Sequence, residues 1–412
     1  MRNIVVQKYG GSSLANTSRI QNVARRIVRF KRRGYRLVVV VSALGSTTDK
    51  LIELSRKITK YPSEREMDML VSTGEQVSVS LLAMAIHKLG EEAISFTGAQ
   101  VGIITDTSHT KARIIDVNAT RILKELKDDK IVIVAGFQGT TLNQDITTLG
   151  RGGSDVTAVA LAVSLKAAAC EICTDVDGIF TADPHIVKNA RKLERISYEE
   201  MLELASLGAQ VMQPRSIEVA GKFKMPLHVR SSFHYRKGTI ISEEVKMMEK
   251  VVVSGVTVNR KEAKVTICDV PDKPGAAARI FKVLADKNIN IDMIIQNISR
   301  TGATDVSFTV NKDELQKTIK TACEISDKIG AEGVTSDDDI AKVSVVGIGM
   351  KSHAGVAAKM FNALAARKIN IEMISTSEIK ISCVIERKKA ESAVKALHKA
   401  FGLGKKAIIK ER

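Results

Sequence analysis

The chain has 412 residues, of which 44% are hydrophobic, so two or three domains with buried cores are expected. Its apolar runs, such as residues 37–41, are far shorter than the ~20 residues of a membrane span, and the N-terminus lacks a secretory pattern. A net charge of +17 is compatible with nucleic-acid binding. Against this function, the basic residues are scattered, Trp is absent and aromatic residues make up only 4% of the chain. We therefore expect a soluble, cytoplasmic protein with no membrane or nucleic-acid partner.

The first predicted element is a strand over residues 3–7, followed by Lys8 and the paired glycines Gly10 and Gly11. Apolar residues spaced three and four apart over residues 20–28 then predict a helix. Paired glycines let backbone N–H groups approach an anion, while a helix N-terminus and a lysine add positive charge. The pattern predicts a phosphate site that is not a Walker A loop. A tight turn beside a surface lysine is the alternative.

Strands and helices alternate up to about residue 240. Short apolar runs at 37–41, 130–134, 171–173 and 227–229 predict strands, and residues 67–89 and 155–168 predict helices. Continuous apolar strands are buried on both faces, as in a mainly parallel sheet covered by helices. The expected class of this part is therefore α/β.

Two polar features lie near these elements. Ser42 directly follows the strand at 37–41, and Thr48 lies in the loop beyond it. Residues 72–76 interrupt a helical stretch with Gly74 and Glu75. A buried glutamate needs a cationic partner, and the ammonium group of a substrate would serve.

A second glycine cluster at residues 150–155 opens the predicted helix at 155–168. It repeats the features of the first cluster, with exposed N–H groups, a helix N-terminus and one cation, Arg151. Asp155 would either cap this helix or orient Lys8 and metal-bound phosphates. Two such loops in one α/β domain favour a phosphate-binding site over coincidence.

Five cysteines argue against a disulfide framework. Cys170 and Cys173 form a CxxC motif, but no second pair or histidine cluster completes a zinc site. Since side chains three apart in a strand point to opposite faces, buried thiols are expected. The loop at 174–178, after this strand, is either a ligand loop at a strand end or a simple Asp-Gly turn.

The C-terminal third contains an internal repeat, because residues 275–294 align with residues 355–374 at an offset of 80. Each copy reads as strand, helix, strand, strand, helix, which is the order of a ferredoxin-like unit. The charged and then β-rich segment 243–263 looks like a hinge before the repeat. A duplicated small module after a large α/β domain predicts regulation, with dimerisation as the alternative.

Six motifs, in this order, resemble those of the aspartate kinases, and the resemblance covers essentially the whole chain. They are KYGGSS at 8–13, STGEQ at 72–76, GFQG at 136–139, GRGGSD at 150–155, TDVDG at 174–178 and QPRS at 213–216. The repeat resembles the tandem ACT domains of that family, with VPDKPG at 270–275 as the typical loop.

The resemblance implies an amino-acid-kinase fold, a mainly parallel sheet between helices, followed by two ferredoxin-like α+β ACT domains. The implied domains are a catalytic domain (1–245), a linker or extra strand (246–263) and ACT domains at 264–338 and 339–412. The implied substrates are L-aspartate and ATP with Mg²⁺, and no protein ligand is assigned to the metal. The β-carboxylate of aspartate would be the nucleophile, and 4-phospho-L-aspartate the product.

The family's functional residues carry over to matching positions here. The implied catalytic residues are Lys8, Arg151 and Asp155. The implied nucleotide-binding residues are Lys8, Tyr9, Gly10, Gly11, Ser12, Thr174, Asp175, Phe180, Asp183, Gln210 and Val211. The implied aspartate-binding residues are Ser42, Thr48, Glu75, Arg151, Gly152, Gly153 and Ser154, with Arg151 on the α-carboxylate and Glu75 near the amine.

Three positions depart from the family pattern. Gln210 stands where a lysine near the nucleotide is common, His185 replaces a usual arginine, and Cys173 replaces a usual aromatic residue. These departures bear on nucleotide affinity more than on identity, because the phosphate and aspartate motifs are intact.

The ACT pair implies feedback regulation by lysine, threonine or both, bound between domains. The implied effector residues are Asp272, Lys273, Pro274, Gly275, Ala276, Ala277, Asp292, Gln296, Val356, Ala357, Asn370, Ile371, Ser377 and Glu378. The domains also imply a homo-oligomer, dimer or tetramer. Met247 and Met248 precede the repeat, so an internally started subunit in an α2β2 assembly is a further possibility.

Two other functions share some of these features. A kinase for glutamate, acetylglutamate or a nucleotide would have the glycine loops, but not this combination of residues 72–76 with an ACT pair. A non-catalytic amino-acid sensor would keep the repeat but could dispense with Lys8, Arg151 and Asp155, all of which are present.

Overall fold

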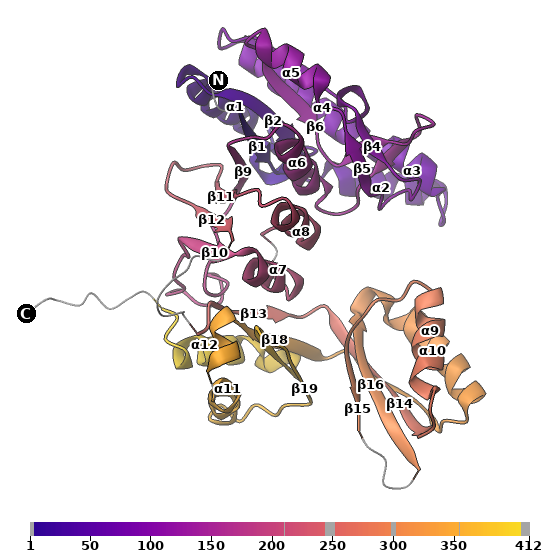
Figure 1. Ribbon diagram of the computed structural model, residues 1–412. Coiled ribbons are helices and arrows are strands. Elements are labelled where there is room, and N and C mark those ends of the chain that lie inside the picture. The colour runs from indigo at the N-terminus through magenta and orange to yellow at the C-terminus, as the bar shows by residue number, and fades with distance from the viewer. Residues whose placement is uncertain (1–3, 210, 244–251, 298–301, 354, 405–412) are drawn as a thin grey trace, which may run out of the picture. The chain divides into compact units, whose positions relative to one another are not determined.

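The computed structural model describes residues 4–209, 211–243, 252–297, 302–353 and 355–404 (Figure 1). The chain forms two compact units. The first contains Met1–Ile179, Lys192–Ser206 and Gln210–Met247, and the second contains Phe180–Arg191, Leu207–Ala209 and Met248–Arg412. The sequence predictions made for Gln210, Met247 and Met248 lie outside the described residues.

The first unit is built on an eight-stranded sheet with the order β10-β12-β11-β9-β1-β2-β6-β3. Its neighbouring strands are parallel except β11 and β12, so the predicted mainly parallel sheet is confirmed. The strands are β1 (Ile4–Tyr9), β2 (Arg36–Val41), β3 (Ala93–Phe96), β6 (Ile131–Ala135), β9 (Ala169–Thr174), β10 (Arg195–Ser197), β11 (Leu227–Ser231) and β12 (Thr239–Ser242).

A smaller sheet of the first unit has the order β5-β4-β7-β8, and its short strands had no clear signal in the sequence. They are β4 (Ile103–Thr105), β5 (Ile114–Val117), β7 (Gln138–Thr140) and β8 (Ile146–Thr148). Strands of three or four residues are too short to show an alternating pattern. Two of its strands, β7 and β8, carry the chain from β6 to the second glycine cluster.

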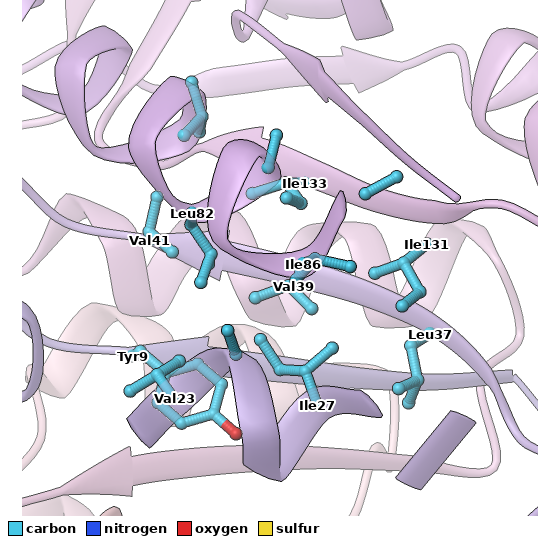
Figure 2. Close-up of a cluster of buried hydrophobic side chains, with 14 of the residues drawn as sticks. Tyr9, Val23, Ile27, Leu37, Val39, Val41, Leu82, Ile86, Ile131 and Ile133 are labelled. Atoms are coloured by element: carbon cyan, nitrogen blue, oxygen red, sulfur yellow. The ribbon is translucent and has the colours of Figure 1, made fainter. Parts of the chain in front are cut away.

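Helices pack against both faces of the large sheet. The first unit contains α1 (Thr17–Arg32), α2 (Thr47–Ile58), α3 (Glu64–Val71), α4 (Thr73–His87), α5 (Thr120–Lys127), α6 (Gly153–Ser164), α7 (Tyr198–Ser206) and α8 (Pro214–Lys222). Figure 2 shows Ile27 of α1 and Leu82 of α4 against the strand residues Val39 and Ile133. Because strand side chains alternate between faces, Tyr9 points to this α1 and α4 face, and Lys8 points to the opposite face, where α6 packs.

The predicted helix over residues 67–89 is two helices in the structure, α3 and α4, which meet at Ser72. The whole stretch Glu64–His87 is long and apolar enough to cross a membrane by length and composition alone. Half of its apolar window is buried inside the protein, as in the core helix of a globular domain.

The second unit contains two modules of the predicted ferredoxin-like order, each an antiparallel sheet with two helices. The first has the strand order β15-β16-β14-β17, and the second β13-β18-β20-β19. The first contains β14 (Glu262–Pro271), α9 (Ala276–Asp286), β15 (Ile291–Gln296), β16 (Ala303–Asn311), α10 (Leu315–Ile329) and β17 (Gly333–Asp337). The second contains β18 (Ile340–Val346), α11 (Val356–Ala365), β19 (Met373–Thr376), β20 (Lys380–Glu386) and α12 (Ala390–Ala400).

The edge strand of the second module comes from the predicted hinge. This strand, β13 (Gly255–Asn259), runs antiparallel to β18, with Gly255 opposite Val346 and Asn259 opposite Lys342. It precedes the first module in the sequence but fills the edge that β17 fills in the first sheet. The duplicated segment alone therefore does not complete the second module.

A segment from the middle of the chain also belongs to the second module. Ala182, Val187 and Ala190 are buried in its core. The hydroxyl oxygen of Thr181 lies 3.0 Å from Nε2 of His398 on α12, and burial lowers the pKa of this histidine. The sequence offered no sign of this packing, because the segment contains no periodic element.

Candidate functional site

Three loops meet at the carboxyl edge of the large sheet, where parallel α/β sheets bind ligands. They follow β1 at Gly10–Gly11, β2 at Ser42–Gly45 and β6 at Gly136. The N–H of Gly45 donates to the carbonyl of Gly11 at 3.1 Å. A Cβ on Gly11 would lie 2.8 Å from the carbonyl oxygen of Ala43, so the two loops touch only because Gly11 has no side chain.

Lys8 and Asp155 form the charged centre between the two glycine clusters. The Lys8 Nζ lies 2.6 Å from Asp155 Oδ1, and the side chains are only 13% and 7% exposed. The contact is an ion pair at this distance, although its angles are not those of a hydrogen bond. The structure thus brings together two residues that are 147 positions apart in the sequence.

Each glycine cluster meets a helix differently. Gly152 is the N-cap of α6, with φ of +71°, so the second cluster opens directly onto an α-helix and Asp155 lies in its first turn. The alternative in which Asp155 is the N-cap was wrong. After the first cluster comes a short 3-10 helix, Gly11–Leu14, and α1 begins only after its N-cap Asn16. The predicted α-helix dipole at Gly10 and Gly11 is therefore absent.

The QPRS segment at 213–216 packs against the second glycine cluster. A Cβ on Gly152 would lie 1.5 Å from Cγ of Gln213, so only glycine fits there. The Arg215 guanidinium donates to the carbonyls of Leu149 and Ala112 at 2.9 and 2.8 Å. The sequence carried this motif but did not indicate its partner.

Asp68 of α3 anchors the loops that lead to the second glycine cluster. It is completely buried, accepts the N–H of Thr110 and the hydroxyl of Thr148, and lies 2.8 Å from Nδ1 of His109. Sequence analysis missed Asp68. The sequence offers one signal for it, a carboxylate inside the helical segment that is otherwise rich in apolar residues.

Glu75 is buried near the loop after β2, with one oxygen bonded and one free. Its Oε1 accepts the N–H of Ala43 at 3.0 Å, whereas Oε2 has no hydrogen-bond partner among the described residues. Burial raises the pKa of this carboxyl to about 7, against the opposing effect of the Ala43 N–H. A buried carboxylate with a free oxygen has the chemistry to bind an ammonium group.

The other predicted aspartate-binding residues differ in how deeply they are buried. Gly153 and Ser154 are buried at the start of α6, whereas Ser42 and Thr48 are half-buried. The Arg151 side chain is 93% exposed, with its Nη2 3.8 Å from Oδ1 of Asp49. Arg151 therefore lies at the surface of the site, with its guanidinium accessible to a ligand.

The predicted nucleotide residues are only partly assembled within the first unit. Thr174 is the last residue of β9, and its hydroxyl donates to Asp175 Oδ1 at 3.1 Å. The Tyr9 side chain is buried in the core, on the sheet face opposite to Lys8. Its hydroxyl donates to Gln7 Oε1 at 3.2 Å. Tyr9 therefore does not offer its ring to a nucleotide, because it alternates with Lys8 along β1.

Two more predicted nucleotide residues, Phe180 and Asp183, belong to the second unit. Phe180 packs against the core of the second module, and Asp183 accepts the N–H of His185 at 2.8 Å. Val211 is half-buried in the first unit. The roles of these residues toward ATP stay predictions.

The CxxC pair consists of two free, buried thiols, as expected. Burial raises the pKa of both, to about 12 for Cys173. Among the described residues, no group of three or more His, Cys, Asp or Glu side chains is placed to hold a metal ion.

The predicted effector residues fall in similar regions of the two modules, but in the repeat only Ala276 with Val356 and Ala277 with Ala357 are equivalent. The loop at 272–275 precedes α9, and Val356 and Ala357 form the first turn of α11. Asp292 and Gln296 lie on β15, whereas Asn370 and Ile371 precede β19 and Ser377 and Glu378 follow it. Two ion pairs connect the modules. Asp292 of the first module pairs with Lys342 of the second, and Lys264 of the first pairs with Glu372 of the second.

Comparison with protein families and known proteins matches the whole architecture. Residues 3–231 match the amino acid kinase family, and residues 264–326 and 343–401 each match an ACT domain. The chain is 50% identical to the aspartate kinase Ask_LysC of Stutzerimonas stutzeri, over 97% of each chain. It is also 50% identical to the aspartokinase of Mycobacterium tuberculosis H37Rv, over 97% of this chain and 96% of that one.

Solved structures agree with these sequence matches. Escherichia coli aspartokinase III in complex with aspartate and ADP (R-state) matches with a TM-score of 0.82 and 26% identity, over 96% of this chain and 99% of that one. The same enzyme with lysine and aspartate (T-state) matches with a TM-score of 0.75 over 97% and 99%. The chain belongs to the aspartate kinases, amino acid kinases that carry a pair of ACT domains.

Proposed function

We propose that this chain transfers the γ-phosphoryl group of ATP to the β-carboxylate of L-aspartate and forms 4-phospho-L-aspartate. The observation that carries the substrate choice is the free, buried oxygen of Glu75, which suits the ammonium group of an amino acid. The relatives are named as aspartate kinases, and one structural neighbour holds aspartate and ADP. The reaction is the first step of lysine, threonine and methionine biosynthesis, which we place in the cytoplasm.

The acceptor needs no general base, because a β-carboxylate with an ordinary pKa near ~4 is already ionised at neutral pH. The barrier is the repulsion between that carboxylate and the phosphate chain. Lys8 and the N–H groups of the two glycine clusters would neutralise the charge that spreads in the transition state. Asp155 would hold Lys8 in place, as its 2.6 Å contact favours.

For substrate positioning, we assign the surface guanidinium of Arg151 to the α-carboxylate. Ser42, Thr48, Gly152, Gly153 and Ser154 would line the remaining part of the aspartate site. Gly10, Gly11 and Ser12 would hold the ATP phosphates, and Thr174, Asp175, Phe180, Asp183, Gln210 and Val211 would contact the nucleoside side.

Mg²⁺ fits a site that has a single buried carboxylate, because this ion is commonly bound by substrate phosphates with one or two protein carboxylates. Asp155 is the buried carboxylate beside the phosphate loop. The ion would offset the charge of the phosphate oxygens.

We further propose regulation by lysine, threonine or both at the paired modules, in a homo-oligomer formed through them. Lysine in the T-state structure of the E. coli relative supports the class of effector. The domain limits would be 1–245, 264–338 and 339–412, with β13 of the linker completing the last sheet. An internally started subunit would appear as a second, shorter band when untagged protein is purified.

Trapping the acyl phosphate as a hydroxamate tests the proposal directly. With ATP and Mg²⁺, aspartate should give hydroxamate, whereas glutamate and acetylglutamate should give little. Hydroxamate from glutamate at an equal rate would assign a different amino-acid substrate. No ATP-dependent product from any of them, with lysine or threonine still bound, would make the chain a sensor.

A further inference from the structure

A cavity of about 340 Å³ lies in the first unit, between α1 and the segment that follows β11. It is lined by Arg29 and Phe30 of α1, by Arg33 directly after this helix, by Arg230 of β11 and by Tyr235. Three guanidinium groups thus lie around one small space, with Arg29 and Arg33 exposed to solvent. Pockets for small molecules begin at about this volume.

The positive charge around this cavity is not balanced by carboxylates. In the described part of the chain, neither Arg29 nor Arg33 forms an ion pair, and their guanidinium groups lie 5.0 and 5.8 Å from the ring centres of Tyr235 and Phe30. Arg230 pairs with Glu171 at 3.0 Å, but its Nε is buried without a hydrogen-bond partner. Of the three arginines, only Arg230 is paired with a carboxylate in the described part of the chain.

A fourth arginine, Arg26, contacts the segment after β11 that contains Tyr235. Arg26 is 2% exposed and donates through Nη1 to the carbonyls of Ser231 and His234 at 2.9 and 3.0 Å. Its Nε and Nη2 have no partner among the described residues, and its guanidinium lies 5.1 Å from the Tyr235 ring centre. Arg26 does not line the cavity, but its uncompensated charge beside Tyr235 adds to the positive potential there and favours an anionic ligand.

The arrangement favours a tetrahedral phosphate over a planar carboxylate. A carboxylate is satisfied by a single arginine fork, whereas a phosphate group accepts hydrogen bonds from several directions. The cavity is also much larger than a bare phosphate needs, since one water occupies only about 30 Å³ of liquid. The rings of Phe30 and Tyr235 provide apolar surface that could contact the organic part of a phosphorylated ligand.

This cavity is separate from the Lys8 and Asp155 site. Its α1 residues and Glu171 lie on the sheet face that holds Gln7 and Tyr9, whereas Lys8 points to the face covered by α6. The two regions are connected through Ser232, whose hydroxyl lies 2.8 Å from that of Ser13 and whose N–H donates to Thr174 at 2.7 Å. Tyr235 is three residues further along the same segment.

We propose that the cavity of Arg29, Arg33 and Arg230 is a second anion site, which binds a small organic phosphate away from the kinase centre. This site does not depend on the proposed reaction. Occupancy would order the segment 231–235 that also touches the first glycine cluster.

Calorimetric titration of the full chain with pyrophosphate, at constant ionic strength and without Mg²⁺, tests the site. The Lys8→Ala variant should keep one saturable pyrophosphate site per chain, because only the phosphate loop is altered. Adding Arg29→Gln and Arg33→Gln to this variant should weaken binding by about tenfold or more, as expected for lost charge-assisted hydrogen bonds. The double variant Arg25→Gln and Arg32→Gln removes the same charge from the same helix and should leave binding unchanged.

Four results would overturn the proposal. If Lys8→Ala loses all pyrophosphate binding, the ligand binds only at the phosphate loop of the kinase centre. If both double variants weaken binding equally, the effect comes from net charge and not from this cavity. If Arg29→Gln with Arg33→Gln fails to fold, Arg29→Lys with Arg33→Lys keeps the charge but loses the fork, so unchanged affinity there is also a negative result. Ribose 5-phosphate should bind more tightly than inorganic phosphate. Equal affinities would instead indicate an adventitious ion only.

Discussion

Lys8 and Asp155 meet at 2.6 Å because a strand end and a helix start converge at one edge of the sheet. Lys8 is at the fifth position of β1, and Asp155 is in the first turn of α6, which packs on the same face. Each glycine cluster therefore contributes one member of the pair. The pair holds the Lys8 ammonium between two loops that offer N–H groups to an anion.

Replacement of Lys8 by alanine should lower kcat at least ~100-fold, because it removes one electrostatic stabiliser of the transferring phosphoryl group. Steady-state kinetics with saturating aspartate and ATP would measure this. The control is Lys130→Ala, which removes a lysine paired with Glu125 at 2.7 Å, remote from the glycine clusters in the sequence. A folded Lys8→Ala enzyme with near-normal turnover would remove Lys8 from the mechanism.

The KM for aspartate should fall by up to about tenfold as pH rises from 6 to 8, because Glu75, whose pKa burial raises to about 7, becomes ionised over this range and can pair with an ammonium. Glu75→Gln should raise KM and flatten this profile. The exposed Glu66→Gln should leave the profile unchanged. A pH-dependent KM that persists in Glu75→Gln would assign the titration to another group.

Glu75 should also make the stability of the protein depend on pH. Its pKa is higher in the folded chain than the ordinary 4.5, so the folded state favours the protonated form. The resulting stability is complete below pH 4.5 and is lost as pH rises to about 7, with a loss of ~3 kcal/mol. Thermal melting should therefore show Glu75→Gln to be more stable than the native chain at pH 8, and nearly equal to it at pH 4.5.

Asp68→Ala should destabilise the first unit by ~2–4 kcal/mol, because it leaves the buried N–H of Thr110 and hydroxyl of Thr148 without their acceptor. The KM for aspartate should rise as well, since these loops lead to the second glycine cluster. Thermal melting and kinetics would check both effects against Asp116→Ala, which changes an exposed aspartate. Equal melting temperatures for the two variants would contradict this role.

The ion pairs that Lys342 and Lys264 form between the two ACT modules should differ in strength. Lys342 is 2% exposed and lies 2.5 Å from the buried Glu262, so Lys342→Met should cost the second unit ~3–5 kcal/mol by leaving a buried charge unpaired. The pair of Lys264 and Glu372 is more exposed, and Lys264→Met should cost at most ~1 kcal/mol. Hydrogen exchange of β14 and β18 would compare them.

Adding Glu262→Gln to Lys342→Met should restore most of the lost protection, because no buried charge then remains. If the double variant is no more protected than Lys342→Met alone, the loss comes from packing.

Local patterns predicted the large elements and the charged site residues well. The apolar runs of β1, β2 and β6 and the 80-residue repeat were readable because strand and helix periodicities are properties of neighbouring residues. The assignment of Tyr9 to the nucleotide came from the family resemblance and not from these patterns, and it stays a prediction. The Tyr9 ring itself lies in the core, because a one-residue step along a strand reverses the face.

The sequence by itself determined the α/β class, the duplicated modules, the two glycine clusters and the family. The tertiary structure decided which distant residues meet. It placed Asp155 on Lys8, Gln213 against Gly152, β13 on the sheet of the second module and Thr181 against His398. These contacts join residues 60 or more positions apart. They depend on the packing of whole elements, which no local periodicity encodes.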